Sequence, residues 1–200
     1  MILFIFEGKR REPHLFKTLE YLFFPIDEHP IVYSYGNNIY ELYKELSMLD
    51  EAGDIVSILR EKAQNEESNP LKDFSMTSDF SEIFLFFDYD IQNKNLSVQQ
   101  MNMQIQEMLH YFNNETNNGK LYINYPMIES IRCTNKLPDN DYYKYTVKKE
   151  DCHHFKNYAT QHYPYYKTFD FLTFRTDSKT NVIVVPTKKK TMKLSQIGCS

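Results

Sequence analysis

The chain contains no tryptophan, and it has only three cysteines and five glycines among its 200 residues. Cys133, Cys152 and Cys199 form no C-x-x-C pair, which favours ordinary reduced thiols over a disulfide framework. No apolar stretch is long enough to span a membrane, and the opening run, residues 2–6, is too short for a signal peptide. We therefore expect a cytoplasmic protein without a membrane partner.

An excess of positive charge is also absent. The net charge of -4 argues against a protein that coats nucleic acid non-specifically, because such binding rests on many phosphate contacts. Basic residues do form two local groups, Lys9-Arg10-Arg11 and Lys188-Lys189-Lys190. A local patch can attract a polyanion despite an acidic total, although we interpret the second group as solvated surface.

Three common catalytic motifs are missing from the sequence. There is no GxxxxGK[ST] phosphate loop, no GxSxG nucleophile elbow and no HExxH zinc motif. These absences exclude the most easily recognised nucleotide-hydrolysing, serine-hydrolase and zinc-protease classes. Any chemistry must then come from other side chains.

Apolar residues make up 42% of the chain and include 15 Phe and 16 Tyr, which is enough for a sizeable core. Short aromatic and β-branched runs predict strands, and periodic apolar positions between them predict helices. The expected strands are residues 2–6, 31–35, 83–87 and 121–125. The expected helices are residues 12–23, 38–49, 55–59 and one that starts at a Ser97–Gln100 capping box and is stopped by residues 117–119.

Strands that alternate with helices predict an α/β fold: a Rossmann-like, mostly parallel sheet of about four strands with helices on both faces. Residues 64–77 are polar and predict a loop. We expect one domain over residues 1–137 and a C-terminal α+β extension over residues 138–200. In the extension, residues 150–163 favour a helix and residues 181–185 a strand.

Three carboxylates follow two of the predicted strands. Glu7 ends the first run, and Asp88 and Asp90 end the third. The carboxyl ends of parallel strands share one edge of the sheet, where ligands and metals usually bind. A single aspartate there would be explained by a turn or helix cap. Two on one face repel each other, so a neutralising divalent cation is the simpler explanation.

Glu7 alone is weaker evidence, because a glutamate at this position can also cap the next helix or pair with Lys9. Gly8 favours the functional interpretation, since glycine permits a tight turn and the close approach of a ligand. Glu7-Gly8 together with a later strand-terminal Asp88-Tyr89-Asp90 is more specific than either motif.

The residues Ile5-Phe6-Glu7-Gly8-Lys9 and Phe86-Phe87-Asp88-Tyr89-Asp90 resemble the Toprim domain. That domain occurs in topoisomerases, bacterial primases, and the nucleases of the overcoming-lysogenization-defect group and of several phage-defence systems. The resemblance covers roughly residues 1–135. It implies Glu7, Asp88 and Asp90 as catalytic, metal-binding carboxylates, and Mg²⁺ or Mn²⁺ as the cofactor.

The function implied by the resemblance is a metal-dependent nuclease that hydrolyses phosphodiester bonds of DNA or RNA and acts in defence against phage. Lys9, Arg10 and Arg11 are then candidate contacts of the substrate phosphates. An ATPase or another protein of a defence system is the implied partner, and a homo-oligomer is left open.

Glu129 is a candidate fourth member of the site. It follows the fourth predicted strand in Tyr125-Pro126-Met127-Ile128-Glu129, which is similar to a YPxxE stretch in defence-associated Toprim proteins. It would complete the metal site or bind a second ion. The alternative is that Glu129 caps a helix beginning near Met127.

Two other functions remain open from the sequence. One is a regulatory subunit whose pocket binds a metal or a nucleotide without turnover. The other is a haloacid-dehalogenase-like phosphatase with Asp88 as the nucleophile; in that family the DxD motif usually follows the first strand, whereas here it follows the third.

Overall fold

The computed structural model describes residues 1–24, 28–48, 53–90, 95–125, 127–134, 136 and 139–164. The chain divides into two compact units, Met1–Ile128 and Glu129–Ser200. The division therefore falls earlier than the predicted boundary after residue 137. Its position has a physical reason: the amide of Ile128 donates a hydrogen bond of 2.8 Å to Asp88, which ties the chain to the first unit up to this residue.

The first unit contains one five-stranded sheet with the order β2-β1-β3-β5-β4. The strands are β1 (Ile2–Phe6), β2 (Ile31–Ser34), β3 (Glu82–Asp88), β4 (Asn113–Asn114) and β5 (Gly119–Asn124). β1, β2, β3 and β5 are parallel, and β4 alone is antiparallel to its neighbour. This confirms the predicted α/β class and the mostly parallel sheet, and it is compatible with a Rossmann-like fold.

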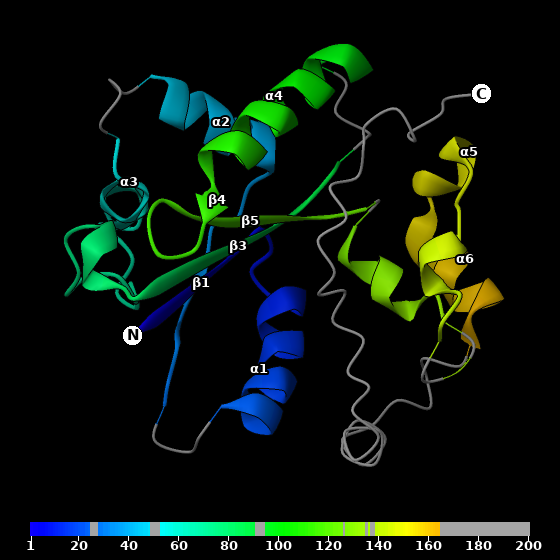
Figure 1. The fold of residues 1–200 in the computed structure, drawn as a ribbon, viewed down its shortest axis with the longest axis horizontal. Helices are drawn as coiled ribbons and strands as arrows, with labels where there is room; N and C mark the ends of the chain where they lie inside the picture. The colour runs from blue at the N-terminus through cyan, green and yellow to red at the C-terminus, as the bar shows by residue number, and fades with distance from the viewer. Residues whose placement is uncertain are drawn as a thin grey trace. The chain divides into compact units, whose positions relative to one another are not determined.

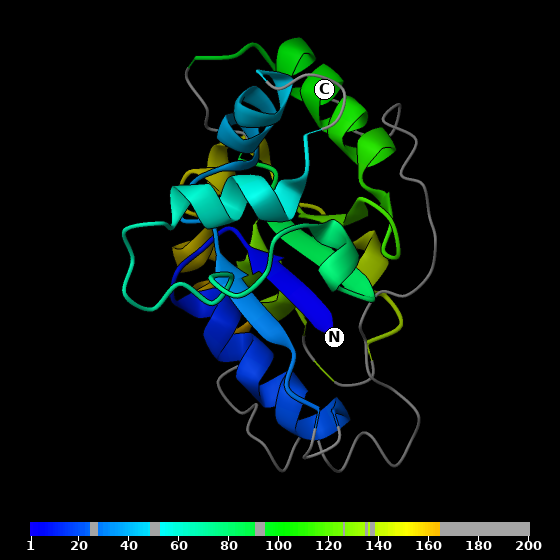
Figure 2. The same ribbon diagram turned by 90° about the vertical axis from the view of Figure 1, so that its left-hand side faces the viewer.

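Helices cover both faces of the sheet, as predicted. They are α1 (Arg11–Phe23), α2 (Ile39–Ser47), α3 (Ile55–Lys62) and α4 (Val98–Tyr111). Figures 1 and 2 show α1 on one side of the sheet and α2 and α4 on the other. Among the described residues, no helix is long and apolar enough to cross a membrane.

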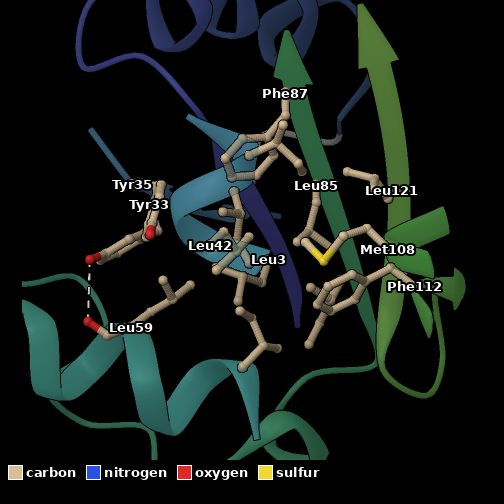
Figure 3. Close-up of a cluster of buried hydrophobic side chains, with 14 of the residues drawn as sticks. Leu3, Tyr33, Tyr35, Leu42, Leu59, Leu85, Phe87, Met108, Phe112 and Leu121 are labelled. Atoms are coloured by element: carbon tan, nitrogen blue, oxygen red, sulfur yellow. Dashed lines mark hydrogen bonds between the residues drawn. The ribbon is translucent and has the colours of Figure 1, made fainter. Parts of the chain in front are cut away.

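Two apolar clusters, one on each face, hold these layers together. On the α1 face, Phe16 packs against Phe4 and Phe6. The larger cluster joins the opposite face of the sheet to α2, α3 and α4, and Figure 3 shows part of it. Its fully buried members include Leu3, Leu42, Leu59, Leu85, Phe87 and Phe112.

Local signals explain where several helices begin. The predicted capping box at Ser97 and Gln100 is confirmed, since each side chain bonds the backbone amide of the other residue. Asn38 caps α2 by accepting hydrogen bonds from the amides of Tyr40 and Glu41. These side chains satisfy backbone amides that have no partner within the helix, and so fix where each helix begins.

The region after α4 differs from the prediction. The helix ends at Tyr111, before the predicted stop signal at residues 117–119, because Phe112 turns into the core and becomes fully buried. Residues 113–124 instead form a hairpin that adds β4 to the edge of the sheet. Gly119 has φ +106°, and a Cβ atom there would lie 2.8 Å from Leu85, so glycine fits this position best.

The predicted loop over residues 64–77 ends in a short 3-10 turn, η1 (Thr77–Asp79). It is not entirely polar surface, because Leu71 is completely buried in the larger apolar cluster. The loop therefore covers part of the core between α3 and β3.

The second unit contains η2 (Ile128–Arg132, which starts at the boundary), η3 (Tyr142–Lys144), α5 (Lys149–Cys152) and α6 (Phe155–His162). The single helix predicted over residues 150–163 is thus two helices, separated at His153 and His154. The described part of this unit has no strand. The strand predicted at residues 181–185, the basic group Lys188-Lys189-Lys190 and Cys199 lie outside the described residues.

Candidate metal and catalytic site

The carboxylates Glu7 and Asp88 lie at a topological switch point of the sheet. β1 and β3 are neighbours, but the chain continues from β1 into α1 on one face and from β3 toward α4 on the other. In doubly wound sheets, ligands bind beyond the carboxyl ends of the strands at this point. The order of the elements thus brings together two motifs that are about eighty residues apart in the sequence.

Glu7 is fixed by three hydrogen bonds. Its amide donates to the carbonyl of Phe86 at 3.0 Å, and its carbonyl accepts from the amide of Gly36 at 2.8 Å. Its Oε2 atom accepts from the amide of Asp88 at 2.8 Å. The backbone bonds extend the pairing of β1 with both neighbouring strands, and the side-chain bond joins Glu7 directly to the Asp88-Tyr89-Asp90 motif.

Asp88, the last residue of β3, is also held in place. Its Oδ1 atom accepts hydrogen bonds from Asn124 Nδ2 at 3.1 Å and from the amide of Ile128 at 2.8 Å. Asp90 is half-buried and has φ 45°, in the left-handed region that few residues other than glycine adopt. Glu7 and Asp88 are thus joined at one edge of the sheet, and the charge of Asp90, two residues further on, acts on Glu7. A shared metal site of the three carboxylates stays a prediction.

Glu12, the first residue of the helix predicted over residues 12–23, is a neighbouring carboxylate that was not among the predicted site residues. It lies in the first turn of α1, and only 7% of its surface is exposed. A Cβ atom at Gly8 would lie 2.3 Å from Glu12 Oε2, so Gly8 leaves space for this carboxylate beside the end of β1. The available signal was the short connection between β1 and α1, which returns the first helical turn to the strand end.

The site carries an excess of negative charge. The pKa of Glu7 is raised from 4.5 to about 8, chiefly by burial; the hydrogen bond from the Asp88 amide lowers it, and the charges of Asp88, Asp90 and Glu12 add to the rise. Burial also raises the pKa of Asp90. These shifts indicate carboxylates whose charge is not compensated, which is the electrostatic environment that favours cation binding.

The donor set fits a hard divalent cation, because carboxylate oxygens are the ligands that Mg²⁺ and Mn²⁺ prefer. In the described part of the chain, no three Asp, Glu, His or Cys side chains are grouped closely enough to hold a metal ion as they stand. One Glu7 oxygen bonds the Asp88 amide instead. Metal binding by Glu7, Asp88 and Asp90 would therefore require their side chains to turn toward a common point.

The three predicted phosphate contacts are all exposed, and their role stays a prediction. Lys9 lies against Gly36 and forms an ion pair of 3.7 Å with Glu66, at the β2 side of the site. Arg10 and Arg11 are exposed at the start of α1.

Glu129 is the first residue of the second unit. It is buried there, in the first turn of η2, and it forms an ion pair with Lys156 at 3.5 Å. The helix that was the alternative explanation for Glu129 is present as this 3-10 turn. Its membership of the metal site stays a prediction.

The first unit is an α/β domain in which carboxylates lie at the switch point of a mostly parallel sheet. Comparisons of the chain with models of protein families, with curated proteins and with solved structures found no match.

Proposed function

We propose that the first unit is a Toprim-type domain that binds Mg²⁺ or Mn²⁺ and hydrolyses phosphodiester bonds in nucleic acid. The observation that carries the proposal is the hydrogen bond between Glu7 Oε2 and the Asp88 amide, which places the Glu7-Gly8 motif beside the aspartate motif. The raised pKa of Glu7 adds electrostatic support, since a cation would relieve the charge that causes part of it.

Glu7, Asp88 and Asp90 are the residues that would hold the ion, and the charge of Glu12 acts on Glu7. The ion would supply positive charge to the phosphate and promote deprotonation of the attacking water. In the hydrolysis, water oxygen forms a bond to phosphorus, the bond from phosphorus to the leaving ribose or deoxyribose oxygen breaks, and that oxygen gains a proton. With a pKa of about 8 before an ion binds, Glu7 can hold a proton near neutral pH.

The direct test is to incubate the purified chain with single- and double-stranded DNA, tRNA and other RNA, in Mg²⁺, Mn²⁺ or EDTA. We expect cleavage of at least one substrate class with Mg²⁺ or Mn²⁺ and none in EDTA. Metal binding without cleavage of any substrate, with or without an ATPase partner, would instead support the regulatory alternative. A phosphatase would release phosphate from monoesters and leave the nucleic-acid chain intact.

The proposed role in defence against phage has its own test. Bacteria that express the chain should reduce phage plaque numbers, and bacteria that express the Asp88→Asn variant at the same level should not. Equal protection by both proteins would exclude a defence role for this site.

Arg10, His14 and Lys17 suggest how a substrate would approach the site. Arg10 directly precedes α1, and His14 and Lys17 lie on it; all three are exposed, whereas Glu12 and Phe16 of the helix are buried. At 1.5 Å per residue, positions 10 to 17 span about 10 Å, or roughly three nucleotides of one strand of a duplex. This basic stripe starts beside Gly8 and suits contact with successive phosphates.

Replacement of both Arg10 and Lys17 by glutamine should weaken nucleic-acid binding in EDTA. Because each lost phosphate contact lowers the slope of log K against log salt by about 0.9, we expect a slope smaller by about 1 to 2. Fluorescence anisotropy at several salt concentrations measures this slope. The matched control is Lys44→Gln with Lys72→Gln, which removes the same charge from exposed positions elsewhere. Equal slopes for the two double variants would exclude the stripe as the binding surface.

A further inference from the structure

Tyr89, the residue between the two aspartates, is held from three elements at once. Only 3% of its surface is exposed, and it packs within the larger apolar cluster. Its carbonyl accepts a buried hydrogen bond of 2.7 Å from the Tyr40 hydroxyl of α2. Its own hydroxyl donates to Asn102 of α4, and its amide donates to the carbonyl of Asn124 in β5 at 3.0 Å.

These bonds restrain the backbone where β3 ends. The carbonyl that Tyr40 contacts belongs to the peptide unit joining Tyr89 to Asp90, and Asp90 has φ 45°. Aspartate adopts this left-handed conformation more readily than most residues other than glycine, and contacts from the surrounding structure help to hold it there. Tyr40 supplies one direct restraint on this peptide unit.

We propose that Tyr40 is a positioning residue of the carboxylate site: its hydroxyl fixes the Tyr89 carbonyl and thereby the direction in which Asp88 and Asp90 present their side chains. This inference rests on the proposed metal-binding function and adds a residue that holds no ion itself. Removal of a group that orients metal ligands through hydrogen bonds, without binding the metal itself, typically lowers metal affinity by ten- to a hundredfold.

The surroundings of Tyr40 suit this role. Only 5% of the residue is exposed. Burial, followed by the neighbouring Tyr89, Asp90 and Glu7, raises the pKa of Tyr40 above its usual value. The hydroxyl therefore keeps its proton and remains a hydrogen-bond donor over the working pH range.

The test compares Tyr40→Phe with Tyr33→Phe in the full chain. Tyr33 is a matched control, because its buried hydroxyl also donates to a backbone carbonyl, that of Leu59 at 3.2 Å (Figure 3). Each substitution removes one such bond and keeps the ring. The measurements are the affinity for Mn²⁺ without nucleic acid, by titration calorimetry, and the thermal midpoint. Tyr89→Phe, which removes the bond to Asn102 alone, is a second variant.

We expect a similar small loss of stability in Tyr40→Phe and Tyr33→Phe, with Mn²⁺ affinity about tenfold lower only in Tyr40→Phe. The Mn²⁺ affinity of Tyr89→Phe should lie between the affinities of Tyr40→Phe and Tyr33→Phe. If Tyr40→Phe and Tyr33→Phe both bind Mn²⁺ as tightly as the wild-type chain, the positioning role is wrong and the metal site stands. A wild-type chain that binds no Mn²⁺ overturns the proposed function, and the positioning role with it.

Discussion

Replacement of Asp88 by asparagine is expected to lower the rate of nucleic-acid cleavage by about a hundred- to a thousandfold, the usual cost of losing one group that stabilises the transition state electrostatically. Asparagine keeps the size of the side chain and a carbonyl oxygen that can still accept from Asn124 and from the Ile128 amide. What it removes is the negative charge. The substitution should therefore lower the rate constant for cleavage and leave the fold intact.

The measurement is single-turnover cleavage of a labelled substrate in Mg²⁺ or Mn²⁺. Glu7→Gln and Asp90→Asn should behave similarly, since all three carboxylates belong to the proposed ion site. Asp73→Asn and Glu67→Gln make the same chemical changes at exposed positions and should cleave like the wild type. Cleavage that survives in both Asp88→Asn and Glu7→Gln would contradict the assignment of this site as the nuclease centre.

Stability in EDTA should fall as the pH rises, because of Glu7. The pKa of Glu7 is about 8 in the folded chain, against an ordinary value of 4.5 that applies to the unfolded chain. Between these two pH values, the folded state binds a proton on Glu7 that the unfolded state does not. Stability that depends on this proton is complete below pH 4.5 and is lost as the pH rises to about 8. The full loss is on the order of 5 kcal/mol, since one pKa unit corresponds to about 1.4 kcal/mol.

Chemical denaturation at pH 5 and pH 8 tests this pH dependence. In EDTA, Glu7→Gln should lose less stability than the wild type over this interval, and at pH 8 it should be the more stable protein. Mn²⁺ should restore the wild type at pH 8, because a cation favours the charged carboxylate, and it should have little effect on Glu7→Gln. Glu67→Gln, an exposed glutamate variant, should follow the wild type throughout. A wild-type stability that does not change between the two pH values would contradict the raised pKa of the half-buried Glu7 carboxyl.

The ends of β1 and β3 could be predicted from the sequence because the signals there are local. A short apolar run that stops at Glu7 or Asp88 needs no tertiary information to be recognised as a buried strand. The Ser97–Gln100 capping box is equally local. Given alternating strands and helices, parallel pairing and a shared sheet edge follow from general rules of topology.

Features that depend on tertiary packing were not predictable in the same way. In the sequence, Glu12 is an ordinary residue of the first turn of a helix. Its carboxylate can lie beside Gly8 only because glycine has no side chain there. Tyr40 is one tyrosine among 16, and its bond to the Tyr89 carbonyl spans 49 positions in the chain. The early end of α4 likewise depends on Phe112 entering the core, a gain that overrides helical periodicity.

Anomalous diffraction from crystals of the full chain grown with Mn²⁺ at pH 8 tests the central claim most directly. We expect bound Mn²⁺ contacted by the side chains of Glu7, Asp88 and Asp90. The Glu7 carboxylate should then be turned away from the Asp88 amide, from which it accepts a hydrogen bond in the present structure. Crystals of Asp88→Asn grown in the same way should show weaker or no Mn²⁺ there. Wild-type crystals in which these three carboxylates contact no ion would contradict the account.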